Sequence, residues 1–152
     1  MTAVLEVDVE TRIEQARRVR TRERLDHLDY LRLLLALAEH MTQRELAGQL
    51  GISQPTVANT LKTARSLADV PEGFSGADPT EIAERHWLGL LSRADTIDQL
   101  GRWNYRPYVV TESGDWLDDE CTWEEVEGAQ QIGLIDMDMY AAAQELNERL
   151  YS

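Results

Sequence analysis

The chain has 152 residues, of which 43% are apolar and 28% are charged, so it is long enough and apolar enough to fold as one ordinary domain or two small ones. Its single cysteine excludes an internal disulfide and a cysteine-based zinc cluster. The net charge of −13 is uneven. Residues 1–65 carry ten Arg or Lys and nine Asp or Glu, a net of +1, which leaves −14 for residues 66–152 and indicates two different roles in one chain.

The N-terminus is acidic and has no apolar signal core. The longest apolar stretch, residues 31–38, contains Arg32 and is much shorter than the ~20 residues that span a bilayer. We therefore expect a soluble, cytoplasmic protein without a membrane partner.

The first 40 residues predict helices after a short ambiguous segment. Residues 5–10 alternate apolar and acidic side chains, which fits a short strand or a frayed acidic tail. Residues 11–24 lack Gly and Pro and predict a helix with six arginines that continues to, or bends near, Leu25. A core-facing helical stripe follows in residues 25–40, formed by Leu25, Leu28, Leu31, Leu35 and Ala38.

Two short helices are predicted next. Thr42 and Glu45 have the spacing of a capping box, which opens a helix that runs to about Leu50. Gly51 supplies a left-handed turn residue, and Ser53 is a suitable N-cap for a second helix that reaches about residue 65. Pro55 falls in the first turn of that helix, where its missing N–H costs nothing.

The second half predicts a linker and more helices. Residues 68–79 contain two Pro and two Gly and predict a linker loop. Residues 79–103 predict a helix capped by Thr80 and a second short helix from Asp95 to about Leu100. Residues 105–113 predict a strand followed by a turn, a candidate short β-hairpin. Residues 122–125 resemble another capping box, opening a helix that stops near Gly133, and residues 137–151 predict a final helix.

The predicted fold is therefore mainly α. It has an N-terminal helix-turn-helix domain over residues 1–67, a linker over 68–79, and an acidic, mostly helical region over 80–152 that serves dimerisation or partner binding.

The segment TQRELAGQLGISQPTVANTLK resembles the helix-turn-helix of bacterial transcriptional regulators. Ala47 is small where the two helices would cross, and Gly51 makes the turn. Leu46, Leu50, Ile52, Val57 and Leu61 fall at buried spacing, whereas Thr60 stands where a branched aliphatic residue is usual. The resemblance implies that the helix over 54–65 lies in the major groove of double-stranded DNA.

The side chains expected to face DNA follow from that placement. Gln54 and Asn59 can each bind adenine in a bidentate manner, and Thr56 can meet a phosphate or a thymine methyl. Contacts to the DNA backbone are expected from the other polar residues near the turn and the helix end. The whole predicted set is Gln43, Ser53, Gln54, Pro55, Thr56, Ala58, Asn59, Lys62, Thr63 and Arg65. The alternative is a helical hairpin that binds no ligand.

The recognition helix alone carries few positive charges for phosphate binding. The arginine-rich helix, represented by Arg17, Arg18 and Arg20, could supply further contacts or insert into a minor groove. The competing interpretation is a solvated face on which Glu14 and Glu23 pair with the arginines. A two-fold dimer would double the contacts and match a palindromic site.

The acidic cluster over residues 115–127 cannot itself bind DNA. It is either a solubilising surface on a dimerisation or effector domain, or a surface that docks a basic protein partner or competes with DNA for the N-terminal half. In the second case Trp116 and Trp123 are candidate anchors beside Asp118 and Asp119.

Enzyme activity is not expected. The three histidines show no metal-ligand spacing, and no phosphate-binding loop or nucleophile motif is present, so neither a metal nor a cofactor is predicted. The favoured function is sequence-specific DNA binding that regulates transcription, typically repression, by a dimer. The alternatives are an antitoxin-type adaptor that autoregulates through the same motif, and a phage or plasmid DNA-packaging or partition factor.

Overall fold

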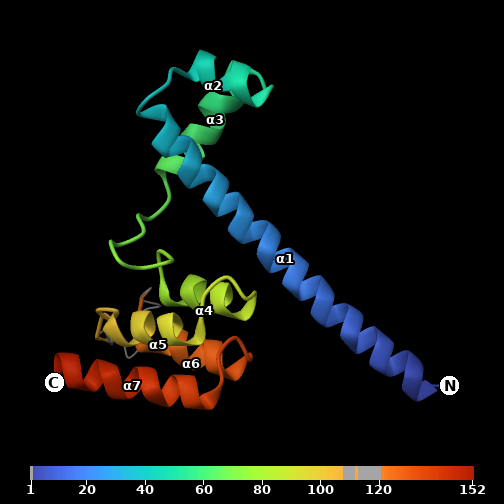
Figure 1. The fold of residues 1–152 in the computed structure, drawn as a ribbon, viewed down its shortest axis with the longest axis vertical. Helices are drawn as coiled ribbons and strands as arrows, with labels where there is room; N and C mark the ends of the chain where they lie inside the picture. The colour runs from blue at the N-terminus through green and yellow to red at the C-terminus, as the bar shows by residue number, and fades with distance from the viewer. Residues whose placement is uncertain (1, 108–111, 113–120) are drawn as a thin grey trace. The chain divides into compact units, whose positions relative to one another are not determined.

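The computed structural model describes residues 2–107, 112 and 121–152, which contain seven α-helices. The chain divides into two compact units, Met1–Ala68 and Asp69–Ser152 (Figure 1). Within the described ranges there is no β-strand, so the protein is mainly helical, as predicted.

The first helix of unit 1, α1, runs from Thr2 to Ala38 without interruption. The alternative of a strand over residues 5–10 was therefore wrong, and the arginine-rich and leucine-rich helices are one element. A helix satisfies its backbone hydrogen bonds within four residues, whereas so short a strand needs a neighbour to pair with. No Gly or Pro between residues 2 and 38 interrupts the helix.

The two short helices are α2, Gln43–Leu50, and α3, Gln54–Arg65. The predicted capping box is confirmed: the N–H of Glu45 donates to Thr42 Oγ1 at 3.2 Å, and the N–H of Thr42 donates to Glu45 Oε2 at 3.3 Å. Gly51 has a φ of 69°, in the left-handed region where a side chain is disfavoured. Ser53 caps α3 by accepting the N–H of Thr56 at 3.2 Å.

The core of unit 1 lies where α2 and α3 pack on the C-terminal part of α1 (Figure 1). It is formed by Leu34, Leu46, Ala47, Val57 and Leu61. Of the predicted stripe on α1, Leu25 and Leu31 are buried and Leu35 and Ala38 pack at the edge of this core. Thr60 is half-buried, and its hydroxyl donates to the carbonyl oxygen of Thr56 at 2.8 Å, so its polar atom is satisfied within α3.

Unit 2 contains α4, Pro79–Trp87, α5, Arg93–Arg102, α6, Trp123–Gln131, and α7, Met137–Tyr151. Helix α5 packs along α7, and α4 packs on both α5 and α6. Their shared core is Ile82, Ala83, Leu100, Trp103, Val126, Ala129, Leu134, Ile135, Met139 and Ala143. The cap of α4 is Asp78, which accepts the N–H of Glu81 at 2.7 Å, and not Thr80 as predicted.

The segment before α4, expected to be a linker loop, is anchored to unit 2. The N–H of Ser75 donates to Gln99 Oε1 at 2.7 Å, and Gln99 Nε2 donates back to Ser75 Oγ at 2.9 Å. The ring of Phe74 meets the edge of Trp103 with 4.9 Å between centroids. Residues 73–76 are therefore an integral part of the second unit.

Two local predictions between α5 and α6 need correction. The candidate hairpin is not supported: residues 105–107 and 112 are not in strands, and the rest of it lies outside the described residues. Thr122 does precede α6 but makes no side-chain cap. The expected partner, Glu125, instead accepts hydrogen bonds from Thr80 Oγ1 at 2.8 Å and from the N–H of Cys121 at 2.6 Å, so contacts outside α6 replace the capping box.

Burial raises the pKa of Glu125 above its ordinary value of 4.5, although the hydrogen bond from Thr80 opposes the shift. Folded protein then binds this proton more tightly than unfolded protein. The contribution of Glu125 to the free energy of unfolding should therefore be greatest below pH 4.5 and fall as the pH rises through the raised pKa. We expect Glu125→Gln to remove this fall, measured by urea denaturation from pH 4 to 7.5. An unchanged pH profile would contradict the assignment, and exposed Glu124→Gln is the control.

Candidate nucleic-acid interface

Helix α3 has one buried and one exposed side. Val57, Leu61 and Ala64 are buried against α1 and α2. Three- and four-residue spacing puts all three on one side of the helix, so Asn59, Lys62 and Thr63 are turned outward, while Ala58 and Thr60 lie at the half-buried edges. The packing of α3 therefore fixes which of its side chains are available to a ligand.

The predicted DNA-facing residues of α3 lie on its outward side. Ser53, Gln54, Pro55, Thr56, Asn59, Lys62, Thr63 and Arg65 are exposed, whereas Gln43 and Ala58 are half-buried. The side chains of Gln54, Asn59 and Lys62 make no hydrogen bond or ion pair with the described part of the chain. Their donors and acceptors are thus free for base edges or phosphates.

Three other polar residues on this side are already engaged within α3 and its N-cap. The hydroxyls of Ser53 and Thr56 share a hydrogen bond of 2.7 Å, and Thr63 Oγ1 donates to the carbonyl oxygen of Asn59 at 3.3 Å. These bonds fix the rotamers of the first turn. The methyl group of Thr56, which takes no part in them, stays available for an apolar contact.

The charge on this surface is positive but sparse. Helix α3 contains no acidic residue and carries Lys62 and Arg65 in its last turn. Arg44, exposed in the first turn of α2, is a candidate that the sequence interpretation missed. Arg44 directly follows Gln43, which was already predicted to contact the DNA backbone, and this position could have identified it as a second such contact.

The arginines of α1 are not part of the same patch. Arg18 pairs with Glu14 at 3.4 Å, as the solvated-face interpretation expected, while Arg17 and Arg20 are exposed. Arg20 precedes Leu34, the α1 residue in the core of unit 1, by 14 positions, which is ~21 Å along a helix.

Most of the predicted partner-binding residues cannot be placed, because Trp116, Asp118 and Asp119 lie outside the described residues. Trp123 is half-buried at the edge of the core of unit 2. Its Nε1 donates to the hydroxyl of Tyr140 at 3.0 Å, and its ring meets Tyr105 edge-on at 5.0 Å. These contacts give Trp123 an intramolecular packing role.

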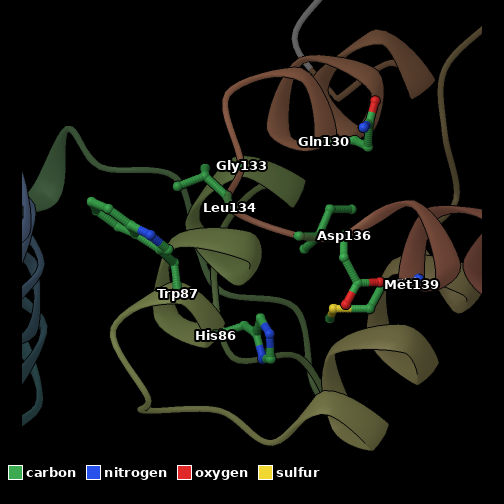
Figure 2. A pocket seen from close by; sticks show the side chains of 8 residues that line it. His86, Trp87, Gln130, Gly133, Leu134, Asp136 and Met139 are labelled. Carbon is green, nitrogen blue, oxygen red and sulfur yellow. Dashed lines mark hydrogen bonds between the residues drawn. The ribbon is translucent and has the colours of Figure 1, made fainter. Parts of the chain in front are cut away.

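A separate pocket lies in unit 2 between α4 and the turn that joins α6 to α7. Figure 2 shows His86 and Trp87 on one side of it and Leu134, Asp136 and Met139 on the other. Its volume is about 470 Å³. His86 Nδ1 lies 3.1 Å from the carbonyl oxygen of Leu91, and the Asp136 carboxylate is hydrogen-bonded to Arg93 and to the N–H of Met139.

The contacts of Asp136 define its role in this pocket. The hydrogen bond from Arg93 lowers the pKa of Asp136, and the N–H of Met139 acts in the same direction. Asp136 is therefore an ionised helix cap at the edge of this pocket.

Among the described residues, no group of three or more His, Cys, Asp or Glu side chains could hold a metal ion. None of their helices contains a stretch long and apolar enough to cross a bilayer.

Comparisons of the chain with protein-family models, with curated proteins and with solved structures find no match.

Proposed function

We propose that the protein is a sequence-specific DNA-binding regulator of transcription that reads the major groove with α3. The observation that carries the proposal is the free polar side of this helix. Gln54, Asn59 and Lys62 project from a helix whose aliphatic side is locked into the core of unit 1, with no internal partner in the described chain. Rigid placement of free amide side chains is what direct base readout requires.

The charge distribution supports the same proposal. The DNA-facing helix has no acidic residue, and the excess negative charge of −14 belongs to residues 66–152. Two copies on a two-fold site would double the few phosphate contacts of Lys62, Arg65 and Arg44 and suit a palindromic operator.

The test begins with in vitro selection of duplexes by the purified protein, followed by binding measurements on the selected site. We expect Gln54→Ala or Asn59→Ala to relax preference at one base pair by ~1–3 kcal/mol, because each removes a bidentate contact. Lys62→Ala should weaken binding to all sequences alike and make the salt slope shallower by about one. Gln144→Ala, an exposed substitution in α7, is the control and should change neither.

The arginines of α1 are tested separately with the triple variant Arg17→Ala, Arg18→Ala and Arg20→Ala. If they contact phosphates, affinity falls equally for selected and random duplexes. If they form a solvated face, both affinities stay the same while α3 still selects its site. Absence of any enriched sequence, or unchanged selectivity in both α3 variants, would refute the proposed function.

A second candidate is an antitoxin-type adaptor, favoured by the strong acidity of the second half. It shares the DNA-binding role and adds a basic protein that docks on unit 2. Purification from its native host would separate the two, because only the adaptor should bring down a stoichiometric small basic partner that high salt releases.

A further inference from the structure

A second stripe runs along α1, apart from the core-facing one. Positions repeat in steps of three and four residues from 9 to 37, and six of these nine positions are apolar. All nine are exposed. We call this set the α1 seam: Val9, Arg12, Ala16, Val19, Glu23, Asp26, Tyr30, Leu33 and Leu37. An average step of 3.5 residues is the repeat of a coiled-coil contact face.

The seam has no partner inside unit 1. Leu33 is 63% exposed and Val19 is 58% exposed, whereas Leu34, next to Leu33 on the helix, is buried in the core. Ordinary surface helices do not repeat exposed branched aliphatic residues at one register over four heptads. The part of α1 before residue 25 also extends well beyond α2 and α3 (Figure 1), and isolated helices are marginal without tertiary contacts.

We propose that the α1 seam binds the α1 seam of a second copy of this chain, with the two helices antiparallel. The inference goes beyond the proposed function and does not depend on DNA binding.

The polar positions of the seam set the direction. In a parallel, in-register pair each charged residue of the seam would face the identical residue of the second copy. Three like-charge contacts, at Arg12, Glu23 and Asp26, would then oppose pairing. An antiparallel pair avoids all three. With Val9 opposite Leu33 of the second copy, these two side chains cover each other at both ends of the pair, while Val19 lies opposite Glu23 and Ala16 opposite Asp26. Arg12 then lies beside Tyr30 of the second copy, a favourable cation–π arrangement.

The size of the contact sets its strength. In this register the two seams overlap from Val9 to Leu33, which is ~36 Å, and a helix presents a face ~10–12 Å wide, so the pair would cover roughly 700–900 Å² in total. This area is below the ~1,200 Å² at which stable, specific protein interfaces start and is typical of weak, transient ones. We therefore expect a dissociation constant of about 1–100 µM, so that the dimer forms reversibly with protein concentration.

The same register separates the two DNA-reading units by a useful distance. Leu34 in each copy, where α2 and α3 pack, lies opposite residue 8 of the other helix, so the two positions are ~39 Å apart along the axis. Adjacent half-sites on one face of B-DNA are ~34–36 Å apart. The seam therefore brings two recognition helices to a spacing that a two-fold operator can match.

The oligomeric state of the full chain, without DNA, tests the proposal by sedimentation equilibrium from 1 to 300 µM. We expect wild type to dimerise and Leu33→Glu and Val19→Glu each to weaken dimerisation by roughly 100-fold, because the first places a carboxylate against Val9 and the second places one against Glu23 of the second copy. Leu50→Glu is the matched control, since Leu50 is 40% exposed on α2 and lies off the seam. Circular dichroism verifies that each variant keeps its helices.

Three outcomes would overturn the seam as an interface. The first is a monomer at 300 µM, which would result if unit 2 of the same chain covers the seam. The second is a dimer that neither seam variant weakens. The third is a dimer that Leu50→Glu weakens as much as the seam variants do.

Disulfide trapping tests the direction. In a Cys121→Ser background, oxidation of a mixture of Val9→Cys and Leu33→Cys proteins should give the mixed disulfide. The Val9→Cys protein alone should not crosslink. Efficient crosslinking of Val9→Cys to itself would show a parallel pair and overturn the antiparallel assignment. Because no DNA is present in these experiments, their results do not depend on whether the protein binds DNA. A protein that fails to dimerise through the seam could likewise still select a DNA site through α3.

Discussion

Leu61→Ala is expected to lower the free energy of unfolding of unit 1 by about 3 kcal/mol and to leave unit 2 unchanged. Leu61 is fully buried in α3 and belongs to the core that joins α3 to α1 and α2. Truncation removes apolar contact and leaves a cavity, which typically costs ~2–5 kcal/mol. A unit of 68 residues has a total stability of only ~3–10 kcal/mol, so the loss is a large fraction of it.

The distribution of tryptophan makes this measurement specific. All four tryptophans lie in unit 2, so their fluorescence follows that unit, whereas far-UV circular dichroism includes the helices of unit 1. We expect the denaturation curve to shift in circular dichroism but not in fluorescence. Leu50, which the sequence spacing predicted to be buried, is 40% exposed at the end of α2, so Leu50→Ala should cost less than ~1 kcal/mol. Equal effects of the two substitutions would show that α3 is not locked into a core.

Gly101→Ala is expected to destabilise unit 2 by about 2 kcal/mol. A Cβ atom at this position in α5 would lie 2.8 Å from Leu146 Cβ and 2.5 Å from Leu146 Cδ2 in α7. The better helix propensity of Ala, worth ~1 kcal/mol, is smaller than the ~1–3 kcal/mol or more that overpacking costs. Tryptophan fluorescence should report the loss directly, because Trp103 lies in the same core.

The same substitution elsewhere in unit 2 should have the opposite sign. Gly128 is also helical, and a Cβ there meets nothing within 4 Å, so Gly128→Ala should stabilise by up to ~1 kcal/mol. Leu146→Ala removes the atoms beyond Cβ that crowd position 101. Its combination with Gly101→Ala should therefore show a coupling of ~0.5–3 kcal/mol. A neutral Gly101→Ala together with no coupling would mean that α5 and α7 do not cross this closely.

Short-range signals in the sequence predicted the helices of unit 1 well. The capping box of Thr42 and Glu45, the left-handed Gly51 and the Ser53 cap each act within a few residues, so no distant contact was needed to recognise them. The same is true of α7, which occupies the predicted residues 137–151. The outward side of α3 followed once the buried spacing of Val57 and Leu61 was known.

Features that depend on distant partners were not predictable in this way. The pattern at residues 122–125 looked like a capping box, but Glu125 is held by Thr80, 45 residues away. Asp78, and not Thr80, is the N-cap of α4. Pro79 then occupies the first helical turn, where its missing N–H needs no partner. The free polar side of α3 could be expected from the spacing of its aliphatic residues. The ~21 Å between Arg20 and Leu34 along α1 could not be, because it depends on α1 being one continuous helix.

The attachment of residues 73–76 to Gln99 and Trp103 determines where the chain can be divided for separate expression. A recombinant fragment that starts at Pro79 would discard Phe74 and Ser75, leaving the Gln99 amide without its two hydrogen bonds and one edge of Trp103 in water. A fragment that starts at Asp69 keeps these contacts. Limited proteolysis should accordingly cleave the connection around residues 66–70 before it reaches the anchored segment.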